Sequence, residues 1–189
     1  GAGVAQQAIG AYARIQQEER QRADETAVLE ATNNLVRLEN RLLYDPEKGA
    51  LTIKGKDAMP LPETVGAEFE KEAGAIASTM KTDRQRSAFA RERANRALQV
   101  DSTLRRHVYG EMQRYESGEL NAFVENETNV AIANALDPKA VSQSLTRITE
   151  KIARHGPRAG MGPEAVEKAV AGAQSSVHVS VLDRLLALE

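Results

Sequence analysis

The stretch LLYDPEKGALTIKGKDAMPLPE (residues 42–63) interrupts a chain whose other segments have the composition of helices. It contains three of the six prolines of the sequence. Asp45-Pro46 is expected to end the preceding helix, because the residue before a proline is driven out of the α region. The stretch therefore divides one long helix from the helices that follow it.

Within this stretch, Gly49 and Gly55 predict turns, and residues 50–54 predict a short strand-like segment between them. A single segment of this length supports at most a small hairpin or an extended arm. We therefore expect an all-α protein, built as an extended antiparallel array of long helices, with one short loop or hairpin insertion near residues 44–58. Lys54 and Lys56 are expected to face solvent or a partner subunit.

The segment before this loop predicts one long helix over residues 1–43. Its second half repeats apolar residues every three or four positions, as in a helix that buries one face: Val28, Ala31, Leu35, Leu38 and Leu42. Its middle, QQEERQRADET, is polar and is expected to be solvated or to lie against a partner. Ile9, Tyr12 and Ile15 form a weaker apolar patch nearer the start.

The segment after the loop predicts a central hairpin of helices over residues 62–136, with residues 44–61 as the elbow before it. Thr82 and Gln85 have the spacing of a capping box, in which each side chain satisfies a backbone amide at a helix start. They predict the start of a very long helix, which is the second helix of this hairpin. Ser117-Gly118 is the expected kink or break, since glycine costs about 1 kcal/mol relative to alanine inside a helix.

The last segment predicts a helical pair over residues 137–189. Asp137-Pro138 predicts the start of its first helix, with the aspartate as N-cap. Gly156-Pro157 predicts the end of that helix, and a second helix follows Gly162-Pro163. Because the sequence ends within a helical pattern, we interpret the chain as part of a longer protein.

Composition excludes several kinds of chemistry. The sequence has no cysteine, so disulfides, thiol catalysis and cysteine-ligated metals are absent. No apolar run approaches the ~18 residues of a membrane-spanning helix. Aromatic residues make up only 4% of the chain, so alanine and leucine must supply most of the core.

The candidate sites for chemistry are incomplete. The glycine- and lysine-rich loop lacks the Ser or Thr of a P-loop and the spacing of a calcium loop. His107 and Glu111 could share a metal ion on one helix face, but zinc sites need three or four ligands. We therefore expect no catalytic residue, no cofactor and no metal site, and no enzymatic activity.

Charge is distributed unevenly along the chain. Residues 81–114 contain nine basic and four acidic side chains, and residues 115–137 contain five acidic and no basic ones. Such blocks favour pairing between helices or subunits, although the arginines could also contact DNA non-specifically. Residues selected as a candidate oligomer or partner surface are Val28, Leu35, Leu42, Arg91, Arg105 and Arg106.

Several motifs occur together along most of the chain. They are LYDPEKGALTIKGKDA (43–58), PETV (62–65), HVYGEM (107–112), ALDP (135–138) and SSVHVSVLDRLL (175–186). In this combination the sequence resembles the internal virion, or ejection, proteins of short-tailed bacteriophages and related prophages.

The resemblance implies a structural protein that lies inside the capsid, forms homo-oligomers around the portal axis and contacts other virion proteins. It also implies that the protein leaves with the DNA and helps to build a conduit across the host envelope. Some such proteins carry or adjoin a murein-cleaving domain, but no residue here matches its motifs. Two alternatives remain: a tail tape-measure or scaffold segment, and a cellular helical adaptor or nucleic-acid-binding protein.

Overall fold

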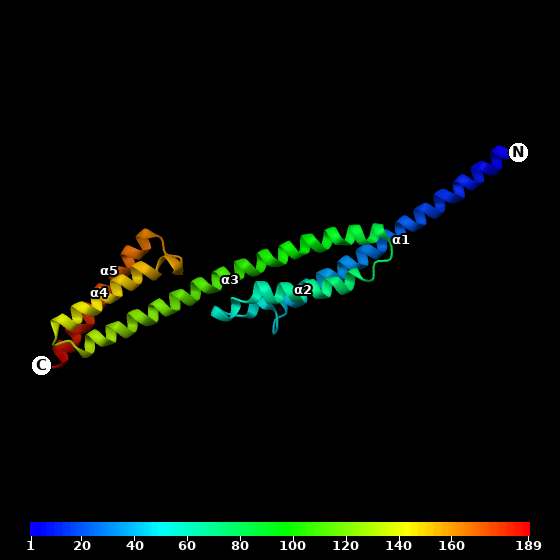
Figure 1. Cartoon of the computed structure of the whole chain (residues 1–189). Helices are drawn as coiled ribbons and strands as arrows, with labels where there is room; N and C mark the ends of the chain where they lie inside the picture. The colour runs from blue at the N-terminus through cyan, green and yellow to red at the C-terminus, as the bar shows by residue number, and fades with distance from the viewer. The chain divides into compact units, whose positions relative to one another are not determined.

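The computed structural model describes residues 1–189 and contains helices only, which confirms the all-α prediction (Figure 1). In chain order the elements are α1 (Ala2–Tyr44), η1 (Ala50–Thr52), η2 (Gly55–Ala58), α2 (Leu61–Ala77), α3 (Asp83–Ala133), α4 (Pro138–His155), η3 (Pro157–Ala159) and α5 (Pro163–Ala187). The chain forms two compact units, Gly1–His107 and Val108–Glu189. Their boundary lies within α3, whereas the sequence-based boundaries lay in loops. The two units are described in turn.

The loop between α1 and α2 contains two short 3-10 helices, so the predicted strand-like segment at residues 50–54 is wrong. Backbone amides of Thr52 and Ile53 donate to the carbonyls of Gly49 and Ala50, at 3.0 and 3.1 Å. These local bonds satisfy the backbone without a second strand to pair with. The junction between the two short helices, at Ile53 and Lys54, is extended.

Asp45 ends α1 as predicted, and its side chain then shapes the turn. Its backbone is extended, with ψ of 128°. Its Oδ1 accepts hydrogen bonds from the amides of Glu47 at 2.9 Å and Lys48 at 2.8 Å. Gly49 follows at a point where an added Cβ would lie 2.5 Å from the Asp45 carbonyl oxygen. The loop therefore needs glycine here for a close approach.

The first unit packs α2 and the first part of α3 against the second half of α1. Its core is made of buried apolar side chains from the three helices and the loop: Ala31, Leu35, Leu38, Leu43, Ala50, Ala58, Leu61, Phe69, Ala73, Phe89, Val100 and Leu104. The predicted apolar face of α1 is thus confirmed at Ala31, Leu35 and Leu38.

Ion pairs join the helices at the edges of this core. Arg93 pairs with Glu70 at 2.8 Å, Arg96 pairs with Glu39 at 3.0 Å, and Arg41 pairs with Glu72. The bond from Arg41 lowers the pKa of the Glu72 carboxyl. Exposed pairs of this kind contribute at most about 1 kcal/mol each, so buried apolar surface remains the main source of stability.

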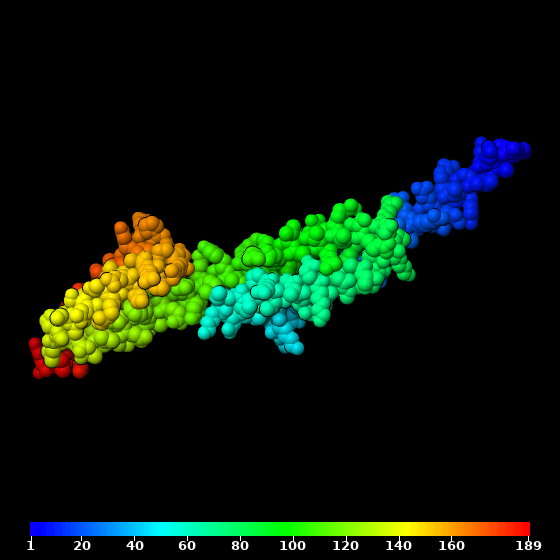
Figure 2. Space-filling model, in the orientation of Figure 1, coloured from blue at the N-terminus to red at the C-terminus, as the bar shows by residue number.

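The N-terminal part of α1 extends past α2 and α3, and no other segment of this unit covers it (Figures 1 and 2). Its large apolar side chains are exposed: Val4, Ile9, Tyr12 and Ile15. An isolated helix of this composition gains little from intrinsic propensity alone, because most helical stability in proteins comes from tertiary packing. This part of α1 therefore offers an uncovered apolar surface.

Helix α3 starts where the capping box predicts. The Gln85 amide donates to Thr82 Oγ1 at 3.1 Å, and Gln85 Oε1 accepts from the Lys81 amide at 2.8 Å. Helix α3 has no break at Ser117-Gly118, because it continues through both residues. A glycine costs about 1 kcal/mol within a helix, which weakens the helix without interrupting its hydrogen bonds.

The second unit is a three-helix bundle of the end of α3 with α4 and α5. Its buried core is Leu120, Ala131, Ala135, Val141, Ile148, Ile152, Val177 and Val181. Asp137 caps α4 as predicted, accepting hydrogen bonds from the amides of Lys139 and Ala140 at 3.0 and 3.2 Å. Each core position of α4 lies on one face, so α4 is strongly amphipathic.

The turn from α4 to α5 depends on two glycines with different roles. Gly156 has helical φ and ψ, and an added Cβ would lie 2.6 Å from the Ile152 carbonyl oxygen. It would also lie 3.2 Å from Met161 Sδ and from a Val166 methyl group. Gly160 has φ of 88°, in the left-handed region that favours glycine. Gly156 thus allows close packing, and Gly160 reverses the chain.

Candidate functional site

The residues selected from the sequence as a partner surface have different environments. Leu35 is 0% exposed and belongs to the core of the first unit, which corrects its assignment to a partner surface. The apolar face that carries it is covered by the chain's own helices. Val28 and Leu42 are half-buried. Arg91, Arg105 and Arg106 are exposed on α3.

Most arginines of the basic segment are paired with carboxylates of the same chain. Besides Arg93 and Arg96, which bridge to other helices, Arg86, Arg105 and Arg114 pair within α3 with Asp83, Asp101 and Glu111. The Asp101 carboxylate lies 2.8 Å from Arg105 and raises the pKa of its guanidinium. Much of the local positive charge is therefore compensated, which weakens the case for a phosphate-binding surface.

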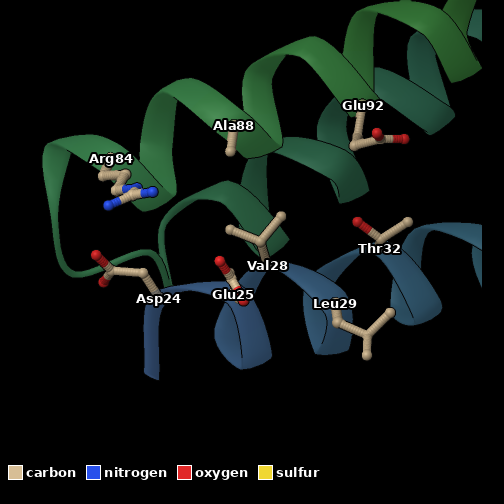
Figure 3. A pocket seen from close by; sticks show the side chains of 8 residues that line it. All are labelled: Asp24, Glu25, Val28, Leu29, Thr32, Arg84, Ala88 and Glu92. Atoms are coloured by element: carbon tan, nitrogen blue, oxygen red, sulfur yellow. The ribbon is translucent and has the colours of Figure 1, made fainter. Parts of the chain in front are cut away.

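A groove with a volume of about 340 Å³ lies between α1 and α3 in the first unit. The close-up in Figure 3 shows the side chains that line it: Asp24, Glu25, Val28, Leu29, Thr32, Arg84, Ala88 and Glu92. Val28 points from α1 toward Ala88 of α3, and Leu29 points away from α3. The floor of the groove is apolar, and carboxylates outnumber cations around it. A groove of this kind suits an apolar helix better than an anion.

One end of the groove is closed by a polar cluster of Asp24, Thr82 and Gln85. Asp24 Oδ1 accepts from Gln85 Nε2 at 2.8 Å and from Thr82 Oγ1 at 3.0 Å. Gln85 is only 6% exposed, so its amide needs these partners. The cluster joins the polar middle of α1 to the start of α3. The sequence predicted the capping box but not the aspartate that completes it.

His107 has a structural contact with the loop. Its Nε2 lies 2.8 Å from the carbonyl oxygen of Ile53. Glu111, the other member of the candidate metal pair, is buried and pairs with Arg114. No group of three or more His, Cys, Asp or Glu side chains is placed to hold a metal ion.

The second unit has a smaller groove of about 180 Å³ that includes Leu120, Phe123 and Lys151. Lys151 Nζ lies 5.4 Å from the centre of the Phe123 ring, a cation–π contact. His155 Nδ1 lies 3.6 Å from Glu116 Oε2 on its rim. These contacts join α3 to α4 within the unit.

The uncovered part of α1 and the neighbouring groove are open apolar surfaces of the first unit. Sequence reasoning noted Ile9, Tyr12 and Ile15 as a weak patch but did not select them. Their mutual spacing was the available signal, since apolar residues repeating every three or four positions mark a helix face whether or not the chain itself covers it.

None of the helices combines the length and apolar character needed to cross a membrane. Comparison with known protein families, with curated proteins and with solved structures found no match to this chain.

Proposed function

We propose that the chain is a structural subunit that assembles with other subunits through the uncovered face of α1. The observation that supports this most directly is the N-terminal part of α1, whose large apolar side chains have no cover within the chain. Exposed apolar surface that is concentrated in one segment marks interaction sites. The role we propose is structural, and polar contacts between helices in both units are consistent with it.

The specific assembly we propose is the internal core of a bacteriophage particle, with the protein acting in DNA ejection. The sequence motifs at residues 43–58 and 107–112 support this proposal. In the structure they meet, because the ring of His107 contacts the carbonyl oxygen of Ile53. On this proposal the protein lies inside the capsid, contacts other virion proteins, and reaches the host envelope on infection.

Mass spectrometry of purified particles, before and after DNA release, tests the proposal. The particles come from the phage or induced prophage that encodes the chain. We expect the protein in full particles and its loss from emptied ones. If it stays with emptied particles, it is a fixed head or tail component, as for a tape-measure protein. If it is absent from all particles, a cellular adaptor role replaces this proposal.

DNA binding by the arginine-rich part of α3 is tested separately. Because most of these arginines are paired with carboxylates, we expect weak binding that depends little on Arg91 and Arg105. Salt-dependent binding that is lost in the double variant Arg91→Glu, Arg105→Glu would instead favour a nucleic-acid-binding protein. Fluorescence anisotropy with a labelled duplex, measured at two salt concentrations, distinguishes these outcomes.

A further inference from the structure

The uncovered face of α1 carries a regular pattern, here called the outer stripe. It consists of the positions that repeat every four and then three residues from Val4 to Val36. The spacing is that of a coiled-coil seam. The stripe is apolar at both ends, with Val4 and Ile15 near one end and Leu29 near the other, and it is charged in the middle at Glu18 and Arg22.

The outer stripe is distinct from the face of α1 that packs inside the first unit. Val4 is 70% exposed, Ile15 is 54% exposed and Leu29 is 61% exposed. The inner face, by contrast, contains Ala31 and Leu35, which are buried. The centre of the outer stripe contains both signs of charge, so Glu18 and Arg22 are complementary when the stripe is reversed, while Glu25 then lies opposite Ile15.

We propose that the outer stripe binds the outer stripe of a second copy of this chain in antiparallel orientation. The inference deepens the proposed function, and it rests on that function in taking α1 as the assembly surface. In this arrangement the two-fold axis passes close to residue 20. The interface is isologous, so every contact is made twice.

One register satisfies the charges and the apolar ends together. It places Glu18 opposite Arg22 of the second copy, and symmetry repeats this pair. The same register places Val4 opposite Val36 and Ala11 opposite Leu29. A parallel pairing in register would instead place Glu18 opposite Glu18 and Arg22 opposite Arg22, and like charges in contact oppose association. The charge pattern thus selects the antiparallel orientation.

The groove between α1 and α3 fits the same register. Glu25, Leu29 and Thr32 belong to the outer stripe and also line the groove. In this register Thr32 and Leu29 lie opposite Ala8 and Ala11 of the second copy, and Glu25 lies opposite Ile15. Arg14, the only charged side chain in residues 1–17, would lie beside Glu25 on the flank of the seam. The groove is rich in carboxylates, so this cation is complementary to it.

Charge exchange within the outer stripe tests the pairing. We expect sedimentation equilibrium of the native chain to show a dimer. The variant Glu18→Arg places arginine opposite arginine twice, so we expect its dissociation constant to rise by about tenfold or more. The double variant Glu18→Arg, Arg22→Glu restores opposite charges and should recover most of the affinity. Glu167→Arg, an exposed change on α5, serves as the matched control and should leave the dimer intact.

Spin labels test the orientation, and the lack of native cysteine allows single labelling sites. A label on Glu19→Cys lies near the two-fold axis and should show a short distance between copies. A label on Gln6→Cys, an exposed position on the side of α1 away from the stripe, should show a separation of about 42 Å along the helix axis, since an α-helix rises about 1.5 Å per residue. Short distances at both sites would mean parallel helices and would overturn the proposal.

Two further results would also overturn it. One is a chain that stays monomeric at high concentration. This result overturns the proposal also where the stripe binds lipid vesicles or another virion protein instead. The other is a dimer that is indifferent to both charge variants. The particle measurement is independent of these results. If the chain dimerises as proposed but is absent from particles, the antiparallel pairing stands and only the proposed function is wrong.

Discussion

At the scale of single residues, Asp45 shows how one side chain sets the direction of the chain. It stops α1 before Pro46, and its carboxylate then accepts two backbone amides of the following turn. Hydrogen bonds to the charged form favour that form, so the amides of Lys48 and Glu47 lower the pKa of Asp45 below its ordinary value of 3.8. The turn is therefore stabilised by the ionised aspartate.

This shift predicts a pH dependence of stability. The folded pKa lies below the unfolded one, so the stabilisation is present above about pH 4 and is lost as pH falls through the folded pKa. Asp45→Asn keeps an acceptor oxygen but cannot ionise. We expect this variant to have a lower melting temperature than the native protein at neutral pH. The difference in melting temperature between the two proteins should become smaller as the pH falls toward about 3. Circular dichroism melts measure both effects.

The matched control for this test is Glu47→Gln, which changes an exposed carboxylate two residues away. Its carboxylate makes no contact with the turn amides, while its backbone amide donates to Asp45. The control should therefore follow the native protein at every pH. A difference between Asp45→Asn and the native protein that stays constant with pH would contradict the assignment to ionisation.

Substitution of glycine by alanine is predicted to have opposite effects on stability at two positions of the second unit. Gly156→Ala places a methyl group against Ile152, Met161 and Val166, and overpacking of this kind costs about 1–3 kcal/mol. Gly172→Ala lies within α5 where no atom would be closer than 4 Å, so it should stabilise by about 0.5–1 kcal/mol. Urea unfolding of both variants measures the difference, and equal effects would contradict the structure.

At the scale of elements, the start of α3 depends on a residue of α1. Asp24→Ala removes the acceptor for Thr82 and Gln85 and leaves the buried amide of Gln85 unsatisfied. We expect a loss of about 1–3 kcal/mol in the unfolding free energy. Asp24→Asn keeps an oxygen acceptor and should lose less. Urea unfolding followed by circular dichroism provides the values.

The control for this prediction is Glu30→Ala, which removes an exposed carboxylate elsewhere on α1. Exposed substitutions away from caps and cores usually change stability by less than about 0.5 kcal/mol. If Glu30→Ala and Asp24→Ala destabilised the protein equally, the loss would reflect general charge on α1. The proposed link between α1 and the start of α3 would then be wrong.

Element boundaries were predictable where the signal is local. Asp45-Pro46, Thr82 with Gln85, and Asp137-Pro138 each act within a few residues, and each boundary is confirmed. The strand at residues 50–54 is absent, and α3 has no break at Gly118, for a common reason. Each feature depends on more than its local sequence. A strand at residues 50–54 would need a second strand to pair with, and α3 keeps its backbone hydrogen bonds through the glycine.

The candidate surface was less predictable than the elements. A period of three and four residues identifies a helix face, but it does not reveal which neighbour covers that face. Leu35 is therefore in the core and Val4 is exposed, although both belong to apolar patterns on α1. Likewise, the sequence could not assign Arg93 and Arg96 to ion pairs, because their partners on α2 and α1 are distant in the chain.

At the scale of the whole molecule, each unit has a core of its own. Phe69 is buried in the first unit and Ile148 in the second, and the two side chains belong to different units. A large-to-small change in such a core costs about 2–5 kcal/mol. Because neither core extends into the other unit, we expect the unit that carries the change to lose stability first.

We therefore predict that Ile148→Ala lowers hydrogen-exchange protection in α4 and α5 and leaves the protection of α1 and α2 near its native level. Phe69→Ala should lower protection in α1 and α2 and leave that of α4 and α5 near its native level. Native-state exchange with mass spectrometry resolves the two units because peptides report on each helix separately. Leu186→Ala, an exposed change on α5, should alter neither pattern. Uniform loss of protection across α1 to α5 in either core variant would show that the two units unfold together, and the separate cores would then not act as independent sources of stability.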